Sequence, residues 1–257
     1  MLERNNLMSP DRAAALRIQA TWTPATVPPA LQAGEVHVWR VHIDDDAWPV
    51  DQLAAALSGE ESERAARFKF DYLQRRFKIT HGILRRLLAG YLGIAPETPT
   101  LDIGVHGKPS LSADIGTLQF NISDSNGEAL LAFSTSQQLG VDLEYHRDNI
   151  HCLEVAERFF CADEIAALKS YPAEQLRRVF FRGWTRKESY MKATGGGIAS
   201  GVDTFAVSLA PDTPALLHAD DGDLDWTMSN LPDIPDFSSA LCVRPEITCV
   251  RYFMMSP

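Results

Sequence analysis

The chain has 257 residues, of which 45% are hydrophobic and 23% charged, and its formal net charge is −10. This length allows one large domain or two of ordinary size, each with a proper core. The acidity argues against general nucleic-acid binding, and no apolar run approaches the roughly 18 residues that a membrane span needs. The four cysteines have no CxxC spacing and indicate reduced thiols in a cytoplasmic protein.

The N-terminal third predicts a leader followed by a strand and helices. Residues 1–33 contain four prolines and predict a poorly ordered leader. Alternation of apolar and polar residues predicts a strand at Glu35–Ile43. A short helix is expected at Val50–Leu57, and Ser58 and Glu61 fit a capping box that opens a second helix ending near Phe70.

A long amphipathic helix is expected next, because apolar residues recur at spacings of three and four from Gln74 to Leu92. Eight lysines and arginines but only one acid, Asp71, lie between Arg64 and Arg86. Such a run is either a solvated helix face or a site for a multiply charged anion.

The central segment predicts three strands in succession. Leu118–Ser123 and Ala129–Ser134 read as strands joined by a tight turn at Asn126-Gly127, and a third strand carries residues 140–144.

The C-terminal half predicts helices followed by strands. Helices are expected at His151–Phe160 and Ala162–Ser170, and a third from near Pro172 to Thr194, ended by the glycines at 195–197. Five further strands complete the chain, at residues 205–209, 215–218, 225–228, 240–244 and 248–253.

The order strand, helices, strands thus occurs twice, and the second round begins near Leu139. We therefore expect a two-lobed α+β protein with a cleft between its lobes. The N-terminal lobe is predicted at residues 34–137 and the C-terminal lobe at residues 138–257.

Two acids stand at alternate positions of the third central strand, in the sequence Gly140-Val141-Asp142-Leu143-Glu144. The period of two in a strand places Asp142 and Glu144 on one face and the two aliphatic residues on the other. Paired carboxylates repel each other, and oxygen ligands at this spacing suit a hard cation such as Mg²⁺.

A stripe on the last helix carries an aromatic residue, an acid and two lysines. Trp184, Glu188 and Lys192 fall within roughly 80° of helical arc, and Lys187 lies on the other side of Trp184. The stripe is either a Glu–Lys pair on a solvated face or part of a ligand site, and the glycines that follow permit a close turn beside a ligand.

These two segments resemble the paired motifs of the surfactin-type 4′-phosphopantetheinyl transferases, and the resemblance extends over roughly residues 35–210. Three upstream segments match further motifs of that family: the basic helix at Glu63–Phe68, the loop Gly107-Lys108-Pro109, and Phe120-Asn121-Ile122-Ser123.

The resemblance implies two similar α+β lobes, related by a pseudo-two-fold axis, with coenzyme A (CoA) and Mg²⁺ in the cleft. It implies transfer of the phosphopantetheine arm of CoA to a serine of an apo acyl or peptidyl carrier protein, with release of adenosine 3′,5′-bisphosphate. Mn²⁺ is expected to replace Mg²⁺ in part, because it accepts the same oxygen ligands. A monomer is expected, since one chain holds both lobes.

The resemblance also implies roles for individual residues. Asp142, Glu144 and Glu188 would hold the metal, while Lys187 and Lys192 would approach the pyrophosphate. Glu188, or a water held by it beside the metal, could accept the serine proton, and Glu188 and Lys192 are the expected catalytic residues. The residues expected to contact CoA are Arg64, Arg76, Gly107, Lys108, Pro109, Asn121, Ser123, Asp124, Lys187 and Lys192.

One position departs from the family pattern, because Asp124 stands where a histidine is most common. An ionised aspartate repels a phosphate, so Asp124 must turn away, pair with a neighbouring cation or shift the phosphates. His106 beside the Gly-Lys-Pro loop is expected to be a solvated loop residue.

Three rival functions remain. The chain could be a degenerate relative that binds CoA or a carrier protein without catalysis, and Asp124 is the only residue that favours this. It could be another nucleotide-using phosphotransferase, which the lack of GxxxxGK[ST] and GxGxxG motifs opposes. A nucleic-acid-binding module is suggested by residues 64–86 and opposed by the net charge.

Overall fold

The computed structural model describes residues 16–104, 107–196 and 201–257. Most of the leader, His106 and the last glycine of the 195–197 run lie outside these ranges. Over the described ranges, no helix combines the length and the apolar content that crossing a bilayer requires. All four cysteines carry free thiols.

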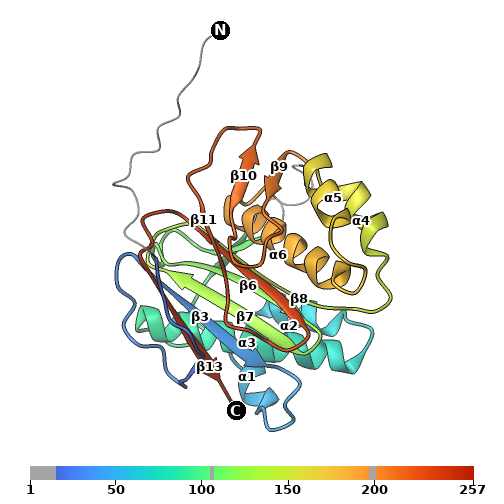
Figure 1. The fold of residues 1–257 in the computed structure, drawn as a ribbon. Coiled ribbons are helices and arrows are strands. Elements are labelled where there is room, and N and C mark those ends of the chain that lie inside the picture. The colour runs from blue at the N-terminus through green and yellow to red at the C-terminus, as the bar shows by residue number, and fades with distance from the viewer. Residues whose placement is uncertain (1–15, 105–106, 197–200) are drawn as a thin grey trace.

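The chain folds into layers of helix and sheet (Figure 1). A six-stranded sheet has the order β1-β13-β3-β7-β6, with β2 also paired to β13, and a three-stranded sheet has the order β11-β12-β8. The strands of these two sheets are β1 (Arg17–Ile18), β2 (Thr23–Pro24), β3 (Glu35–His42), β6 (Gln119–Ser125), β7 (Glu128–Ser134), β8 (Leu139–Tyr145), β11 (Thr227–Asn230), β12 (Phe237–Val243) and β13 (Cys249–Met255).

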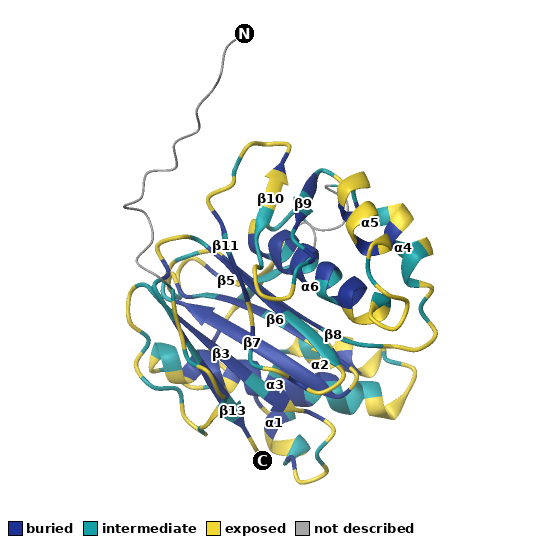
Figure 2. Cartoon of the chain, viewed as in Figure 1, coloured by how far each residue is buried: buried dark blue, intermediate teal, exposed yellow. Residues whose placement is uncertain are grey.

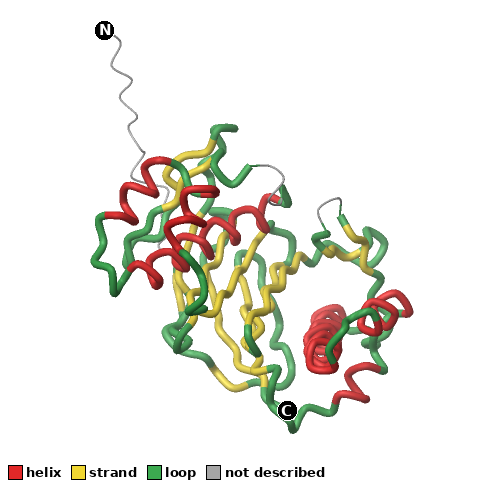
Figure 3. The backbone as a smooth tube through the Cα atoms, turned by 90° about the vertical axis from the view of Figure 1, so that its right-hand side faces the viewer, coloured by secondary structure: helices red, strands yellow, loops and turns green. Residues whose placement is uncertain are grey.

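Helices cover the outer face of each sheet, and Figure 3 shows the two groups of helices on opposite sides of the strands. The helices are α1 (Val50–Ala54), α2 (Gly59–Ala66), α3 (Asp71–Leu92), α4 (Cys152–Phe159), α5 (Ala162–Lys169) and α6 (Leu176–Thr194). Two small hairpin sheets pair β4 (Leu101–Ile103) with β5 (Pro109–Leu111), and β9 (Phe205–Val207) with β10 (Leu216–Ala219).

The core of the protein lies between these layers, and the central strands are buried on both faces (Figure 2). On β7, Leu131 and Phe133 pack toward α3, while Leu130 and Ala132 pack with Val141 of β8. This alternation follows from the period of two in a strand and places the three-stranded sheet face to face with the larger sheet. The far side of the three-stranded sheet packs against α6.

The predicted elements correspond closely to the observed ones. Ser58 and Glu61 form the predicted capping box at the start of α2, with hydrogen bonds of 3.0 and 3.2 Å. The turn between β6 and β7 has positive φ at both central residues, Asn126 (43°) and Gly127 (87°), as a tight hairpin requires. The predicted last helix begins later than expected, at Leu176, because residues 173–175 form a turn after Pro172.

Two parts of the chain lie differently from the sequence interpretation. Residues 17–18 and 23–24, within the predicted poorly ordered leader, form short parallel pairings with β13. Strand β13, at the end of the predicted C-terminal lobe, pairs in parallel with β3 of the N-terminal half. The larger sheet therefore draws its strands from both predicted lobes, and residue 138 divides the chain but not this sheet.

Candidate active site

Strands β8 and β6 lie side by side, and side chains of β6 bond the backbone of β8. The side-chain oxygens of Asn121, Ser123 and Ser125 accept hydrogen bonds from the backbone N–H groups of residues 141, 143 and 145, at 2.9, 3.3 and 3.2 Å. Alternate residues of β6 thus satisfy alternate N–H groups of β8. This arrangement joins the edges of the two sheets at the strand that carries the acid pair.

The same hydroxyl groups hold the two acids of β8. Ser123 donates to Asp142 Oδ1 at 2.9 Å, and Ser125 donates to Glu144 Oε2 at 3.1 Å. Each hydroxyl therefore accepts from one backbone amide and donates to one carboxylate, which fixes its rotor. The two carboxylates share one face of β8, as the alternation in the sequence predicted.

Asp142 is buried, with a side chain only 5% exposed, and its two oxygens differ in their contacts with the described residues. Oδ1 accepts from Ser123 and from Lys192 Nζ, the latter at 2.7 Å. Oδ2 is buried and has no hydrogen-bond partner among the described residues. A buried carboxylate oxygen without a partner loses its hydration with nothing in return, unless a cation or a proton takes that place.

Helix α6 reaches this strand because residue 140 is glycine. A Cβ at Gly140 would lie 2.0 Å from the Ser189 carbonyl oxygen and 2.4 Å from the Ala193 nitrogen. No other residue type fits so close to the helix backbone. The close approach brings Glu188 and Lys192, on either side of the contact, up to the acids of β8.

Glu188 is a half-buried carboxylate whose side chain makes no hydrogen bond or ion pair with a described residue. Burial and the negative charges of Asp142 and Glu144 raise its pKa to about 7, although Lys192 acts in the opposite direction. Burial and Asp142 also raise the pKa of Glu144, which pairs with Arg147 at 3.1 Å. Asp142 therefore lies near enough to Glu144 and Glu188 to disfavour the ionisation of both.

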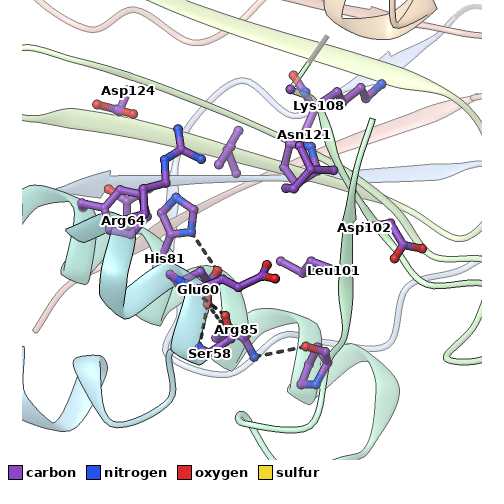
Figure 4. Close-up of a pocket in the computed structure, with 18 of the residues that line it drawn as sticks. Ser58, Glu60, Arg64, His81, Arg85, Leu101, Asp102, Lys108, Asn121 and Asp124 are labelled. Carbon is purple, nitrogen blue, oxygen red and sulfur yellow. Dashed lines mark hydrogen bonds and ion pairs between the residues drawn. The ribbon is translucent and has the colours of Figure 1, made fainter. Parts of the chain in front are cut away.

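A cavity of about 1580 Å³ lies beside the acids, and both halves of the chain contribute to its wall. Figure 4 shows His81 and Arg64 on the side formed by α2 and α3, with Asn121 and Lys108 on the opposite side. Of the residues predicted to act in binding or catalysis, the wall contains Arg64, Arg76, Gly107, Lys108, Pro109, Asn121, Asp124, Glu188 and Lys192. A ligand of nucleotide size fits a cavity of this volume.

Lys108 is predicted to contact a phosphate of CoA, but in the structure its ammonium bonds backbone carbonyl groups. Its ammonium donates to the carbonyl oxygens of Lys192 at 2.5 Å and Leu139 at 3.4 Å. Burial and the charge of Lys192 lower the pKa of Lys108 to about 8. Lys108 therefore links the hairpin β4–β5 to the last turn of α6 and the start of β8, as a cation at a helix C-terminus does.

Lys187 does not line the cavity, so the structure corrects the prediction that it approaches the pyrophosphate. Its side chain is fully buried, and its ammonium bonds both oxygens of Glu164, at 2.9 and 2.8 Å, and the Phe205 carbonyl at 2.7 Å. Glu164 also accepts from the amides of Cys161 and Val207. The buried ion pair of Lys187 and Glu164 therefore joins helices α5 and α6 to strand β9.

Ser123 also differs from its predicted role, because its hydroxyl is buried against Asp142 and is not part of the cavity wall. Arg76, expected to bind a phosphate, makes a bidentate ion pair with Asp44 at 2.7 and 2.5 Å. The charge of Asp124 also raises the pKa of Arg76, after the effects of Asp44. Asp124 forms no ion pair with a described residue, so which of the three predicted outcomes holds for it stays a prediction.

Arg64 remains available on the cavity wall. Its guanidinium carbon lies 5.4 Å from the centre of the Phe77 ring, and the His81 ring stacks with Phe77 at a centroid distance of 3.9 Å. His81 in turn bonds Glu61 at 2.9 Å. Although burial acts against it, hydrogen bonds from His81, the Ser58 amide and Arg85 lower the pKa of Glu61 to about 2.

Sequence reasoning missed Ser125, the closeness of α6 to Gly140, and the Glu61–His81 pair. The signal for Ser125 was present, because Asn121, Ser123 and Ser125 alternate along one strand in the same way as the acids. Nothing in the sequence alone connects residue 125 with residue 144, or Glu61 with His81 some twenty residues later.

The donor set fits a hard divalent cation, although no group of three or more His, Cys, Asp or Glu side chains in the described ranges stands arranged to enclose one. The fit rests on the partnerless Asp142 Oδ2 and on the raised pKa of Glu188. Neighbouring carboxylates repel each other unless cations lie between them. In the structure, Asp142 pairs with Lys192 and Glu144 pairs with Arg147. Carboxylate oxygens beside a cavity that can hold a nucleotide's phosphates are the ligands that Mg²⁺ takes.

Comparison with known proteins gives consistent matches. The sequence model described as the 4′-phosphopantetheinyl transferase superfamily matches residues 138–242. The chain is 41% identical over 222 residues to "4′-phosphopantetheinyl transferase HetI" of Nostoc, covering 85% of this chain and 91% of that protein. It is 33% identical over 207 residues to "Putative 4′-phosphopantetheinyl transferase slr0495" of Synechocystis, covering 79% and 82%. It is 26% identical over 207 residues to "4′-phosphopantetheinyl transferase Sfp" of Bacillus subtilis, covering 79% and 91%.

Proposed function

The chain belongs to the 4′-phosphopantetheinyl transferase superfamily, and from this we propose that it transfers the phosphopantetheine arm of CoA to a serine of an apo acyl or peptidyl carrier protein. Adenosine 3′,5′-bisphosphate is the second product. The carrier supplies the nucleophile, which agrees with the absence of a nucleophile–base pair among the described residues that line the cavity.

Mg²⁺ is the proposed cofactor, held by Asp142, Glu144 and Glu188. The observation that supports it is the buried Asp142 Oδ2 without a partner, beside a carboxylate whose pKa is raised to about 7. When bound, a divalent cation neutralises the charge that develops on the pyrophosphate during attack.

Lys192, Arg64 and Glu188 have the remaining proposed roles in substrate binding and catalysis. The proposed role of Lys192 is to neutralise a pyrophosphate oxygen, which its position on the cavity wall beside Asp142 supports. Arg64 can hold the 3′-phosphate bidentately. The serine proton passes to Glu188 or to a water that Glu188 holds, because the Glu188 carboxylate lines the cavity in which the pyrophosphate would lie.

We also propose that the protein is a cytoplasmic monomer with lobes at residues 34–137 and 138–257. The support for a monomer is that both halves of a single chain supply the cavity wall, so that a second copy is not needed to complete it. In this division β13 crosses back to complete the sheet of the first lobe.

Incubation of the purified protein with CoA, Mg²⁺ and a panel of apo acyl and peptidyl carrier domains tests the proposal. Intact-mass measurement should show at least one carrier gaining the mass of one phosphopantetheine arm. EDTA should stop the gain, and Asp142→Asn should reduce it strongly. The proposal fails if no carrier in the panel gains mass while the protein is folded and binds CoA.

A further inference from the structure

Two large aromatic side chains are exposed at the start of α3. Phe70 is 49% exposed and Tyr72 is 55% exposed, and their rings stack with centroids 5.8 Å apart and planes 23° apart. Neither side chain joins one of the core clusters of the described residues. Exposed aromatic pairs contribute little to folding, but they are the residues that protein–protein interfaces use most.

Cations surround this aromatic pair. Lys69 lies 5.5 Å from the Phe70 ring centre, and Arg76 lies 5.3 Å from the Tyr72 ring centre. Arg67 is exposed beside them. We name Arg67, Lys69, Phe70 and Tyr72 the aromatic–basic surface.

Two cations of this surface have no ion-pair partner among the described residues. Arg76 pairs with Asp44, and Arg75 donates to the carbonyl oxygens of Ile43 and Asp45. Arg67 and Lys69, in contrast, form no ion pair with any residue that the structure describes. Their two positive charges stand out in a protein with a net charge of −10, and they favour a negatively charged partner.

The aromatic–basic surface adjoins the cavity through Arg67, which is part of both. Lys69, Phe70 and Tyr72 lie outside the cavity wall, whereas Arg67 and Arg76 are part of it. Arg76 is electrostatically coupled to Asp124 of β6. The neighbours of Asp124 on that strand, Ser123 and Ser125, hold the carboxylates of β8.

Resting on the proposed function, we propose that the aromatic–basic surface docks the carrier protein through an acidic face that carries at least one apolar side chain. The acceptor serine belongs to a folded partner, and it must come within bonding distance of a phosphate held beside Asp142. A partner in that position covers the protein surface around the cavity, where Arg67 and Lys69 attract acidic residues and the ring pair offers apolar area.

A purely structural role for the ring pair makes a different prediction. If the rings only stabilise the first turn of α3, their removal lowers the unfolding temperature and leaves both Michaelis constants unchanged. If the surface docks the carrier, substitution raises the KM for the carrier and leaves the KM for CoA unchanged.

The experiment compares Lys69→Glu and the double variant Phe70→Ala, Tyr72→Ala with the wild type, using an apo carrier that the wild type modifies. We expect the KM for the carrier to rise by about tenfold in each case, with kcat and the KM for CoA within about twofold of the wild type. Added salt should raise the wild-type KM for the carrier more steeply than that of Lys69→Glu.

Arg86→Glu provides a matched control. Arg86 is exposed on the same helix, roughly 21 Å from Tyr72 along the helix axis at about 1.5 Å per residue. Arg86 forms no ion pair with a described residue. The substitution Arg86→Glu should therefore leave the KM for the carrier and the KM for CoA unchanged. The docking proposal is overturned if the KM for the carrier in both test variants stays within about twofold of the control, or if the KM for CoA rises equally. An inactive wild type would instead refute the proposed transfer itself.

Discussion

Replacing Glu188 by glutamine tests whether three acids share one small volume. Burial, Asp142 and Glu144 raise the pKa of Glu188 from 4.5 to about 7, against the effect of Lys192. One unit of pKa corresponds to about 1.4 kcal/mol, so ionised Glu188 costs the folded, metal-free protein about 3 kcal/mol at pH 8. Glutamine keeps the shape without the charge, and Glu188→Gln should therefore be more stable than the wild type by about this amount.

The pH dependence follows from the direction of the shift. The folded protein keeps the Glu188 proton up to about pH 7, whereas the unfolded chain releases it near pH 4.5. The stability of the metal-free wild type therefore falls as the pH rises through this window, and the variant lacks that fall. At pH 4.5 and below the two proteins should be nearly equal.

Calorimetric unfolding after treatment with EDTA measures this difference. For a chain of this length, about 3 kcal/mol corresponds to a Tm difference of roughly 6 °C at pH 8. Addition of Mg²⁺ at about 100 times its Kd should then stabilise the wild type by about 2.7 kcal/mol and the variant much less. Equal Tm differences at pH 5 and pH 8, or a less stable variant at pH 8, would refute the reasoning.

Three further substitutions probe the surroundings of the acids. Gly140→Ala places a methyl group against the α6 backbone, and it should cost about 3 kcal/mol in urea unfolding and slow transfer at least tenfold; unchanged stability and rate would contradict the close packing. Lys187→Met leaves Glu164 buried without its cation, and it should lower the free energy of unfolding by about 3–5 kcal/mol. A raised KM for CoA with an unchanged Tm would instead show that Lys187 contacts the pyrophosphate. Ser125→Ala removes the donor to Glu144 and should weaken Mg²⁺ binding by about tenfold in calorimetry, whereas unaltered binding would remove Ser125 from the site.

The sequence predicted the elements where local patterns decide them. The capping box at Ser58, the Asn-Gly turn and the alternation of acids in β8 depend on residues only one to three positions apart. Such short-range signals survive folding because the neighbouring atoms that satisfy them are fixed by the local backbone. The two-lobed α+β architecture followed from the order of these elements and from the family resemblance.

Contacts between distant segments could not be read from the sequence. Lys187 and Lys192 carry the same charge on the same helix, but one faces Glu164 and the other faces Asp142. They lie five positions apart, and whether a lysine on that helix faces solvent, cavity or core depends on which element packs there. The sequence likewise does not show that the strand after residue 248 returns to pair with β3, because parallel pairing leaves no short-range turn signal.

A crystal structure of the protein with Mn²⁺ and CoA tests most directly whether Asp142, Glu144 and Glu188 surround one divalent ion. The account predicts an anomalous scattering peak in contact with Asp142 Oδ2, the oxygen that has no protein partner, and with the Glu188 carboxylate. The pyrophosphate of CoA should contact the same Mn²⁺ ion. A peak held by other residues, or bound CoA with no ion beside Asp142, would contradict it.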